Sequence, residues 1–223
     1  MSSIKKVGLT LRLTEEMLYK ELRDSLSNDW TLFLNKMGLM PVLIPNCLKD
    51  PVEYFISSGC EALILTNGEN VKLVKKGNNE FSGTRRDVTE AKLFKYSLEN
   101  SIPVIGVCRG MQFINVYFGG KLTEGIKGHV TESHQLEIKS GRYEDSFGAD
   151  IITNSYHNVG VLLNDVAESL TPWAVKECVV EAVHHVKYPV VAIQWHPERK
   201  NPSWEVDMKL FDMVLKRKIL TCF

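Results

Sequence analysis

The chain has 223 residues, with 27 acidic and 27 basic side chains and therefore no formal net charge. Its content of 44% hydrophobic and 24% charged residues is typical of a globular protein with a sizeable core. The neutral balance indicates no nucleic-acid or membrane partner, and no apolar run approaches the length of a membrane span. The N-terminal segment lacks the apolar core of a signal peptide, so we expect a cytoplasmic protein.

The first 120 residues predict alternating strands and helices. Strands are predicted at residues 5–11, 39–45, 61–66 and 102–108, and helices at residues 27–38, 50–59, 85–100 and 109–120. Asp50 and Pro51 suit the N-cap and first position of the second helix. Polar residues 72–84 predict a surface loop. This order favours a parallel sheet covered by helices on both faces.

The pattern changes after about residue 134. Short alternating segments at residues 133–139, 173–186 and 189–195 predict antiparallel additions or extra strands of the main sheet. Residues 203–218 predict a closing amphipathic helix with Ser203 as its N-cap. No linker or repeat interrupts the chain, so we expect residues 1–223 to form a single α/β domain with a mostly parallel sheet and added antiparallel strands.

One cysteine stands apart from the others. The odd number and scattered spacing argue against a disulfide framework or a zinc site; the cysteines are Cys47, Cys60, Cys108, Cys178 and Cys222. Cys108 ends an apolar strand and precedes a helix, within a G-x-C-x-G pattern. A nucleophile there would lie at the carboxyl edge of the sheet, where a helix N-terminus favours the thiolate. The pattern alone is equally consistent with a buried structural cysteine.

A base for this thiol is predicted at the end of a second apolar strand. Of the six histidines, only His196 has this position. Pro197 favours extended backbone, so Glu198 should project to the same side as His196 and orient its imidazole. The alternative is a surface turn after the strand, but the matching placements of Cys108, His196 and Glu198 would then be a coincidence.

The segments GVCRGMQ and AIQWHPE resemble the motifs of the class I glutamine amidotransferase superfamily. Together with RRDVTE, NSYHN and EAVHH, they resemble its γ-glutamyl hydrolase-like branch. The resemblance implies a flavodoxin-like α/β fold and a Cys–His–Glu triad. In it Cys108 is the nucleophile, His196 the general base and acid, and Glu198 its orienting partner. It implies no cofactor and no metal ion.

The same resemblance implies further site residues. The backbone N–H groups of Gly68 and Arg109 would form an oxyanion hole, and the residues expected near the substrate are Gln112, Asn154, Ser155, Tyr156 and His157. The chain departs from the family pattern at Asn67, where a glycine is usual, at Asn70, where an acidic residue is usual, and at Val159, which replaces a glutamine. These departures concern the leaving-group side.

The resemblance implies cleavage of a γ-glutamyl amide with release of glutamate. The segment after the oxyanion loop is basic; it carries Lys72, Lys75, Lys76, Arg85 and Arg86 against Glu80 and Asp87. A solvated loop would explain it, but it also suits an anionic leaving group. We therefore favour the γ-glutamyl-CDP-amidate hydrolases of this branch, which release cytidine diphosphoramidate for surface-polysaccharide phosphoramidates. Trp204, Tyr143 and Tyr156 could stack on a base or pack elsewhere.

Other functions stay open at this point. The chain could hydrolyse γ-glutamyl amines such as γ-glutamyl-aminobutyrate, supply ammonia to a synthetase as a glutaminase subunit, or be an inactive binding domain. A metal hydrolase would need His134, His157, His184 or His185, for which the sequence has no ligand spacing. We expect a small-molecule γ-glutamyl substrate, no nucleic acid and no membrane partner, and leave open a homodimer.

Overall fold

The computed structural model describes residues 5–76 and 80–215. One sheet contains eleven strands, with a main path in the order β11-β10-β13-β14-β15-β8-β5-β1-β4. Five neighbouring strands of this path are parallel: β15 (Val190–Ile193), β8 (Val104–Val107), β5 (Cys60–Leu65), β1 (Lys6–Thr10) and β4 (Met40–Ile44). The mostly parallel sheet is therefore confirmed.

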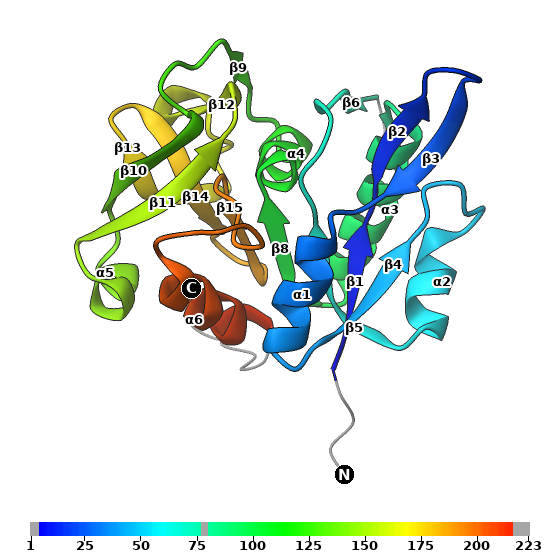
Figure 1. Ribbon diagram of the computed structural model, residues 1–223, viewed down its shortest axis with the longest axis horizontal. Helices are drawn as coiled ribbons and strands as arrows, with labels where there is room; N and C mark the ends of the chain where they lie inside the picture. The colour runs from blue at the N-terminus through cyan, green and yellow to red at the C-terminus, as the bar shows by residue number, and fades with distance from the viewer. Residues whose placement is uncertain (1–4, 77–79, 216–223) are drawn as a thin grey trace.

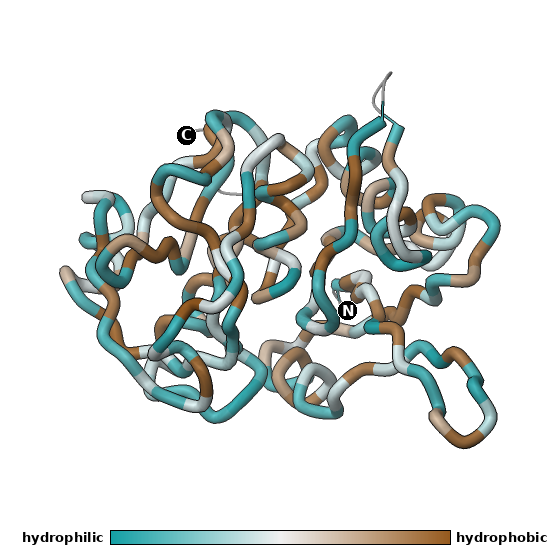
Figure 2. Tube along the Cα trace, turned by 90° about the horizontal axis from the view of Figure 1, so that it is seen from above, coloured by the Kyte–Doolittle hydropathy of each residue, from teal (hydrophilic) through white to brown (hydrophobic). Residues whose placement is uncertain are grey.

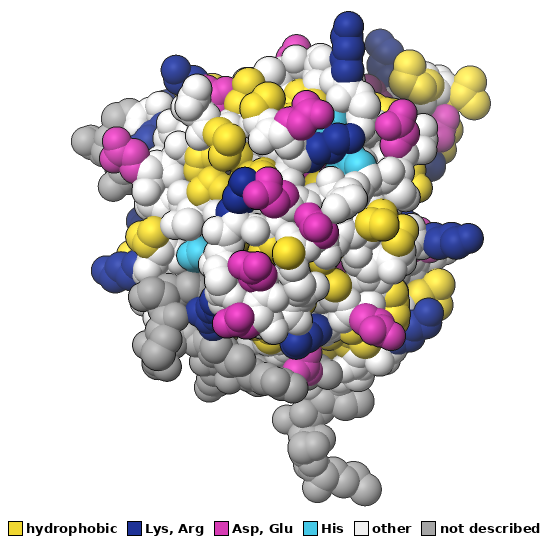
Figure 3. All heavy atoms as spheres, turned by 90° about the vertical axis from the view of Figure 1, so that its left-hand side faces the viewer, with side chains coloured by type: hydrophobic (Ala, Val, Ile, Leu, Met, Phe, Trp, Pro, Cys, Tyr) yellow, Lys and Arg dark blue, Asp and Glu magenta, His cyan; other side chains and the backbone are white. Residues whose placement is uncertain are grey.

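The sheet continues beyond β15 with antiparallel strands, as predicted. They are β14 (Val179–His185), β13 (Leu170–Lys176), β10 (Val130–Ile138) and β11 (Asp150–Tyr156), while β12 (Val159–Leu162) pairs with β14 and with β9 (Thr123–Glu124). Charges of both signs are interspersed on the face at this end of the molecule (Figure 3). That mixture agrees with the zero net charge of the chain.

Helices cover both faces of the sheet (Figure 1). One core contains α1 (Asn28–Lys36), α5 (Gly141–Phe147) and α6 (Trp204–Leu215), and the other contains α2 (Pro51–Ser57), α3 (Arg85–Glu99) and α4 (Arg109–Tyr117). Strand β15 serves both cores, since Val191 and Ile193 point into the first and Val190 and Ala192 into the second. This explains its unbroken apolar sequence. Figure 2 shows hydrophobic segments inside and hydrophilic loops around them.

Local chemistry sets several helix starts. The Asp50 carboxylate accepts hydrogen bonds from the N–H groups of Val52 and Glu53, both at 3.0 Å, which confirms the predicted N-cap of α2. Thr84 and Asp87 form a capping box at α3. The Ser203 hydroxyl donates to the carbonyl of Ile152 and so ties the start of α6 to β11. Residues 216–218 of that predicted helix, and Cys222, lie outside the described residues.

Two hairpins, together with α5, β9, β11, β12 and the 3₁₀ turn Leu163–Asp165, were missing from the sequence prediction. One hairpin joins β2 (Arg12–Glu16) to β3 (Glu21–Ser25), and the other, β6 (Val74–Lys75) with β7 (Phe81–Ser82), lies in the predicted loop. They contribute few buried side chains, so no clear alternation marks them. Both rise from the edge where the parallel strands end (Figure 1). No helix among the described residues is both long and apolar enough to cross a membrane.

The packing around Gly110 generates a stability prediction. A Cβ atom there would overlap the Leu65 carbonyl, whereas one at Gly141 would meet nothing within 4 Å. We expect Gly110→Ala to lower the free energy of unfolding by about 2 kcal/mol or more, and Gly141→Ala to change it by at most about 1 kcal/mol. Urea unfolding of both variants measures this; equal stabilities would contradict the tight packing.

Candidate active site

Cys108 lies on a strained turn between β8 and α4. Its φ of +53° and ψ of −104° are unusual for a residue with a side chain. The turn is held on both sides, because its N–H donates to the Ile193 carbonyl (2.8 Å) and its carbonyl accepts from the Gln112 N–H (3.1 Å). The thiol is therefore placed at the carboxyl end of the parallel strands.

The two flanking glycines allow other segments to approach the turn. A Cβ on Gly106 would lie 2.8 Å from the Gly110 backbone, and one on Gly110 would overlap the Leu65 carbonyl at the end of β5. These contacts agree with the role expected for both glycines: each lets neighbouring backbone pass close to the turn.

His196 and Glu198 follow β15 at the same sheet edge. Ile193 is in register with Val107, the residue before Cys108, so both chains leave the sheet side by side. The imidazole Nδ1 of His196 is 2.8 Å from Glu198 Oε1, and both side chains are buried. Nε2 of His196 has no hydrogen bond of ordinary geometry among the described residues, but Cys108 acts on this imidazole as a hydrogen-bonding neighbour. Nε2 is therefore the nitrogen available for the thiol.

The charges around His196 favour its protonated form. Burial by itself would lower the pKa of this imidazole, but the negative charge at Cys108 and the carboxylate of Glu198 outweigh burial and raise the pKa to about 9. The site therefore favours an imidazolium at His196 at neutral pH.

Gln194 is a further neighbour of the thiol that sequence reasoning missed. Its side-chain amide nitrogen lies 3.7 Å from Cys108 Sγ, within the range of a hydrogen bond to sulfur, and the side chain is fully buried. An amide donor at that distance would stabilise a thiolate. The sequence did contain a signal for this position, because residues i and i+2 of an extended segment, here Gln194 and His196, project to the same side.

Asn154 holds the backbone of His196. Its Nδ2 donates to the His196 carbonyl at 2.8 Å, and its Oδ1 accepts from the His196 N–H at 2.9 Å. Nδ2 also donates to the Lys200 carbonyl at 3.1 Å. The resemblance implied a residue near the substrate, and the structure gives Asn154 a place behind His196, where both ends of its amide fix the loop.

Tyr156 and two cations border the site beside His196. The Tyr156 ring meets the His196 ring edge-on at 5.5 Å, and the Arg199 guanidinium lies 4.5 Å from the centroid of the tyrosine ring. Lys200 and Tyr156 line an adjacent hollow of about 320 Å³ together with the acidic Glu132. This border combines an aromatic surface with the cations Arg199 and Lys200 and the acidic Glu132.

The loop after β5 carries Gly68. Arg86 lies under this loop, where Nη1 donates to the Asn67 carbonyl (3.1 Å) and Nη2 to the Thr66 carbonyl (2.5 Å). A Cβ on Gly68 would overlap this guanidinium, so the close approach requires glycine. Asn67, which departs from the family pattern, accepts a hydrogen bond from the Trp30 indole at 3.0 Å.

A buried charge network supports both the loop and the turn. Glu90 pairs with Arg86 (2.8 Å) and with Arg109, while Arg109 also pairs with Asp87 at 2.5 Å. Burial alone would raise the pKa of Glu90, but the charges of Arg109 and Arg86 outweigh it and lower the pKa. Arg86 and Asp87 are fully buried. Counting them with the solvated basic loop was wrong; its exposed cations are Lys72, Lys75, Lys76 and Arg85.

Several residues implied near the substrate have partners within the protein. Gln112 donates to the Val159 carbonyl (2.9 Å), Ser155 donates to the His129 carbonyl (2.7 Å), and His157 lies 3.2 Å from Glu181. The Arg109 side chain turns into the charge network, but its backbone N–H, at the first position of α4, needs no helical carbonyl. That group stays available beside Cys108.

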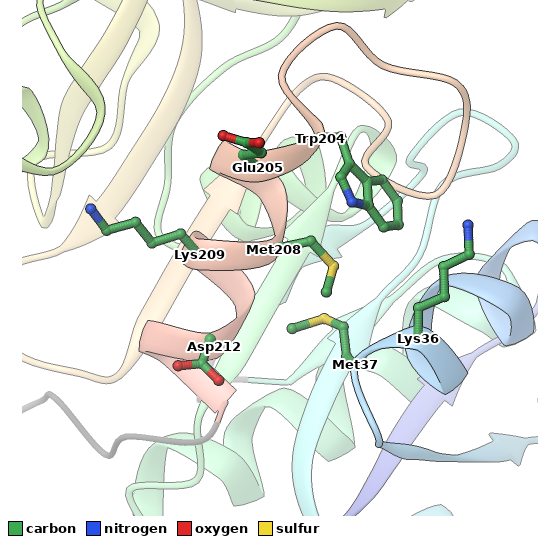
Figure 4. A pocket seen from close by; sticks show the side chains of 7 residues that line it. All are labelled: Lys36, Met37, Trp204, Glu205, Met208, Lys209 and Asp212. Carbon is green, nitrogen blue, oxygen red and sulfur yellow. The ribbon is translucent and has the colours of Figure 1, made fainter.

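Two of the three candidate stacking aromatics lie elsewhere. Tyr143 is buried and stacks on Trp173 at 4.2 Å. Trp204 packs against Phe33 and borders a separate hollow of about 530 Å³ between α1 and α6, where Lys36 lies 4.9 Å from its ring (Figure 4). Of the three, Tyr156 alone adjoins His196.

Comparisons with known proteins identify the family of the chain and support its fold. A family model described as Peptidase C26 matches residues 7–198. The chain is 29% identical to a γ-glutamyl-CDP-amidate hydrolase of Campylobacter jejuni over 87% of this chain and 90% of that protein. It is 28% identical to a glutamine-hydrolysing GMP synthase subunit of Methanosarcina acetivorans, over 70% and 72%. A glutamine amidotransferase structure from Methylobacillus flagellatus has a TM-score of 0.61 at 14% identity, covering 95% of this chain and 76% of the other, and supports the fold.

The buried network generates a second prediction. Replacing Arg86 with methionine leaves Glu90 and Glu69 without this partner, and we expect Arg86→Met to lower the free energy of unfolding by about 3–5 kcal/mol. Arg85→Met changes the preceding, exposed arginine and should stay within about 0.5 kcal/mol of the parent. Denaturant titration compares the two. A tolerated Arg86→Met would show that the loop does not depend on the network.

Proposed function

The chain belongs to the peptidase C26 family, and from that premise we propose that it hydrolyses γ-glutamyl amides with Cys108, His196 and Glu198 as its catalytic triad. Family and relatives support a glutamine amidotransferase-like hydrolase acting on amide bonds. The observation that carries the finer proposal is the position of His196. Its Nδ1 is fixed by Glu198 at 2.8 Å, and Cys108 acts on the same imidazole as a charged and hydrogen-bonding neighbour.

The proposed acylation step begins with Cys108 as a thiolate and His196 as an imidazolium. The Cys108 thiolate attacks the γ-carbonyl carbon, and the carbonyl oxygen becomes an oxyanion. The backbone N–H groups of Gly68 and Arg109 are proposed to bind that oxygen, a contribution of about 3 kcal/mol per donor in comparable enzymes. The His196 imidazolium gives its proton to the leaving nitrogen as the C–N bond breaks. A γ-glutamyl thioester remains on Cys108.

Deacylation reverses the role of His196. The imidazole, now neutral, takes a proton from a water molecule that attacks the thioester carbonyl. The C–S bond breaks, glutamate leaves, and the thiolate–imidazolium pair is restored. Glu198 keeps the proton of Nδ1 in place throughout, so that Nε2 performs both transfers.

We propose γ-glutamyl-CDP-amidate as the substrate, with cytidine diphosphoramidate as the leaving group. The relative from Campylobacter jejuni supports this choice. So does the border beside His196, where Tyr156 offers a ring and Arg199 and Lys200 offer positive charge. The exposed Lys72, Lys75, Lys76 and Arg85 add positive charge around the β6–β7 hairpin.

A second candidate is a glutaminase that supplies ammonia to a separate synthetase. The relative from Methanosarcina acetivorans favours it. The same triad would act, but activity would depend on a partner protein. Hydrolysis of simpler γ-glutamyl amines is a third choice and would not need the cationic border.

Substrate competition tests the proposal directly. We expect glutamate release from γ-glutamyl-CDP-amidate to exceed that from γ-glutamyl-aminobutyrate and glutamine by orders of magnitude in kcat/KM. Cys108→Ala should lower the rate by about 10⁴-fold or more, because the thioester cannot form. Activity of this variant at the parent rate would refute the mechanism, and slow cleavage of glutamine alone would favour the glutaminase function.

A variant of Arg199 tests whether this side chain binds the leaving group rather than acting in the chemical step. Arg199→Gln should lower kcat/KM for γ-glutamyl-CDP-amidate by about 10-fold or more and leave that for glutamine nearly unchanged. Lys209→Gln, which alters an exposed lysine on α6, is the matched control. Equal losses on both substrates would assign Arg199 to the geometry of Glu198, from which its Nε is 3.7 Å away.

The raised pKa of His196 predicts the alkaline limb of the pH profile. Acylation needs the imidazolium, so kcat/KM should fall as the pH rises through about 9, the pKa of His196. Glu198→Gln removes a carboxylate that raises this pKa. The limb should therefore move to lower pH, and kcat should fall by about 10²-fold or more. An unchanged limb in Glu198→Gln would contradict the assignment.

A further inference from the structure

Three histidines and a glutamate meet in the antiparallel half of the sheet, outside the triad. His129 precedes β10, His134 lies within it, His157 follows β11, and Glu181 lies on β14. Each has an exposed fraction of 6% or less. We call these four residues the histidine cluster. The triad uses none of them.

Three ligand-type atoms of the histidine cluster form a nearly regular triangle. His129 Nδ1 is 3.0 Å from Glu181 Oε1 and 3.2 Å from His157 Nε2, and His157 Nε2 is 3.2 Å from Glu181 Oε1. A hydrogen bond needs one donor and one acceptor. With three atoms and only two roles, two of them must share a role. Protons alone therefore leave one of the three contacts unsatisfied in every arrangement.

The tautomer of His157 makes this conflict sharper. Its Nδ1 lies 3.1 Å from the Val159 carbonyl, which can only accept, so Nδ1 carries a proton. In the neutral ring, Nε2 then presents a lone pair to the carboxylate oxygen of Glu181. A cation within the triangle would accept a lone pair from all three atoms and remove the conflict.

His134 supplies a fourth group. The Gly128 backbone is near this ring, but neither ring nitrogen has a hydrogen bond of ordinary geometry among the described residues. Its Nε2 lies 4.0 Å from Glu181 Oε2, an oxygen that likewise lacks a partner within the described chain. Ligand atoms of His129, His134 and Glu181 all lie within 4.8 Å of one another. A small movement would complete four-fold coordination.

We propose that the histidine cluster binds one divalent transition-metal ion of the zinc class. Ligands at 2.0–2.1 Å from a tetrahedral zinc ion lie about 3.3–3.4 Å apart, close to the observed triangle. Three imidazoles and one carboxylate suit zinc, whereas calcium and magnesium prefer oxygen ligands. Four protein ligands leave no position for a water nucleophile, so the role of the ion is structural and independent of the proposed reaction.

The site connects to the triad through the backbone. The His129 carbonyl accepts from the Ser155 hydroxyl (2.7 Å) and from the His157 N–H (2.8 Å). Ser155 follows Asn154, whose amide holds His196. An ion shared by His129 and His157 would therefore stiffen the segment that positions the imidazole of His196.

Zinc titration of the full chain tests the proposal, in a Cys108→Ala background that removes the catalytic thiol as a competing ligand. Chelator-stripped protein should bind one zinc ion per chain in competition with a chromogenic chelator. His134→Gln and Glu181→Gln should each weaken the affinity by at least about 10-fold. His184→Gln, on the same strand as Glu181 but outside the histidine cluster, should bind like the parent.

A cobalt spectrum identifies the ligands. Co²⁺ should give tetrahedral d–d bands without a thiolate charge-transfer band, which excludes the four remaining cysteines, Cys47, Cys60, Cys178 and Cys222, as the binding groups. His134→Gln keeps the test decisive if Glu181→Gln fails to fold, because the ring makes no ordinary hydrogen bond that the fold would lose. No binding by the parent, unchanged affinity in His134→Gln, or a thiolate band would each overturn the proposal.

Discussion

The strained turn at Cys108 is the constraint on which the site depends. A residue with a side chain at φ +53° is unstable by itself, so its neighbours must hold it. The Ile193 carbonyl of β15 accepts a hydrogen bond from its N–H, and α4 begins directly after it with Gly110 packed closely against the Leu65 carbonyl of β5. The same strands that hold the turn also deliver Gly68 and His196 to the sheet edge.

Burial of charge is the second condition. The carboxylates of Glu90 and Asp87 compensate the buried charges of Arg86 and Arg109. The Arg86 guanidinium also donates hydrogen bonds to the two carbonyls that precede Gly68. Because a peptide group is planar, the hydrogen bonds to the Thr66 and Asn67 carbonyls also restrict the orientation of the Asn67 and Gly68 N–H groups. The buried ion pairs thereby help to fix the backbone of the Gly68 loop.

The antiparallel extension gives the triad a second frame. β11 carries Asn154, which holds His196, and Tyr156, which borders it. The histidine cluster takes its residues from β10, β14 and the end of β11, where His157 directly follows Tyr156. The chemistry proposed for Cys108 and the ion proposed for the histidine cluster are thus separate in function but share a short segment of backbone.

The sequence by itself determined the alternation of strands and helices, the position of Cys108 between Gly106 and Gly110, and the placement of His196 with Glu198 after a second apolar strand. These features have local signals: periodicity, caps and i+2 spacing. Only the tertiary structure decided that Arg86 and Asp87 are buried, that Asn154 turns its amide to His196, and that Glu181 meets three histidines. Such contacts join segments tens of residues apart, and no period along the chain records which polar side chains the folded core will bring together.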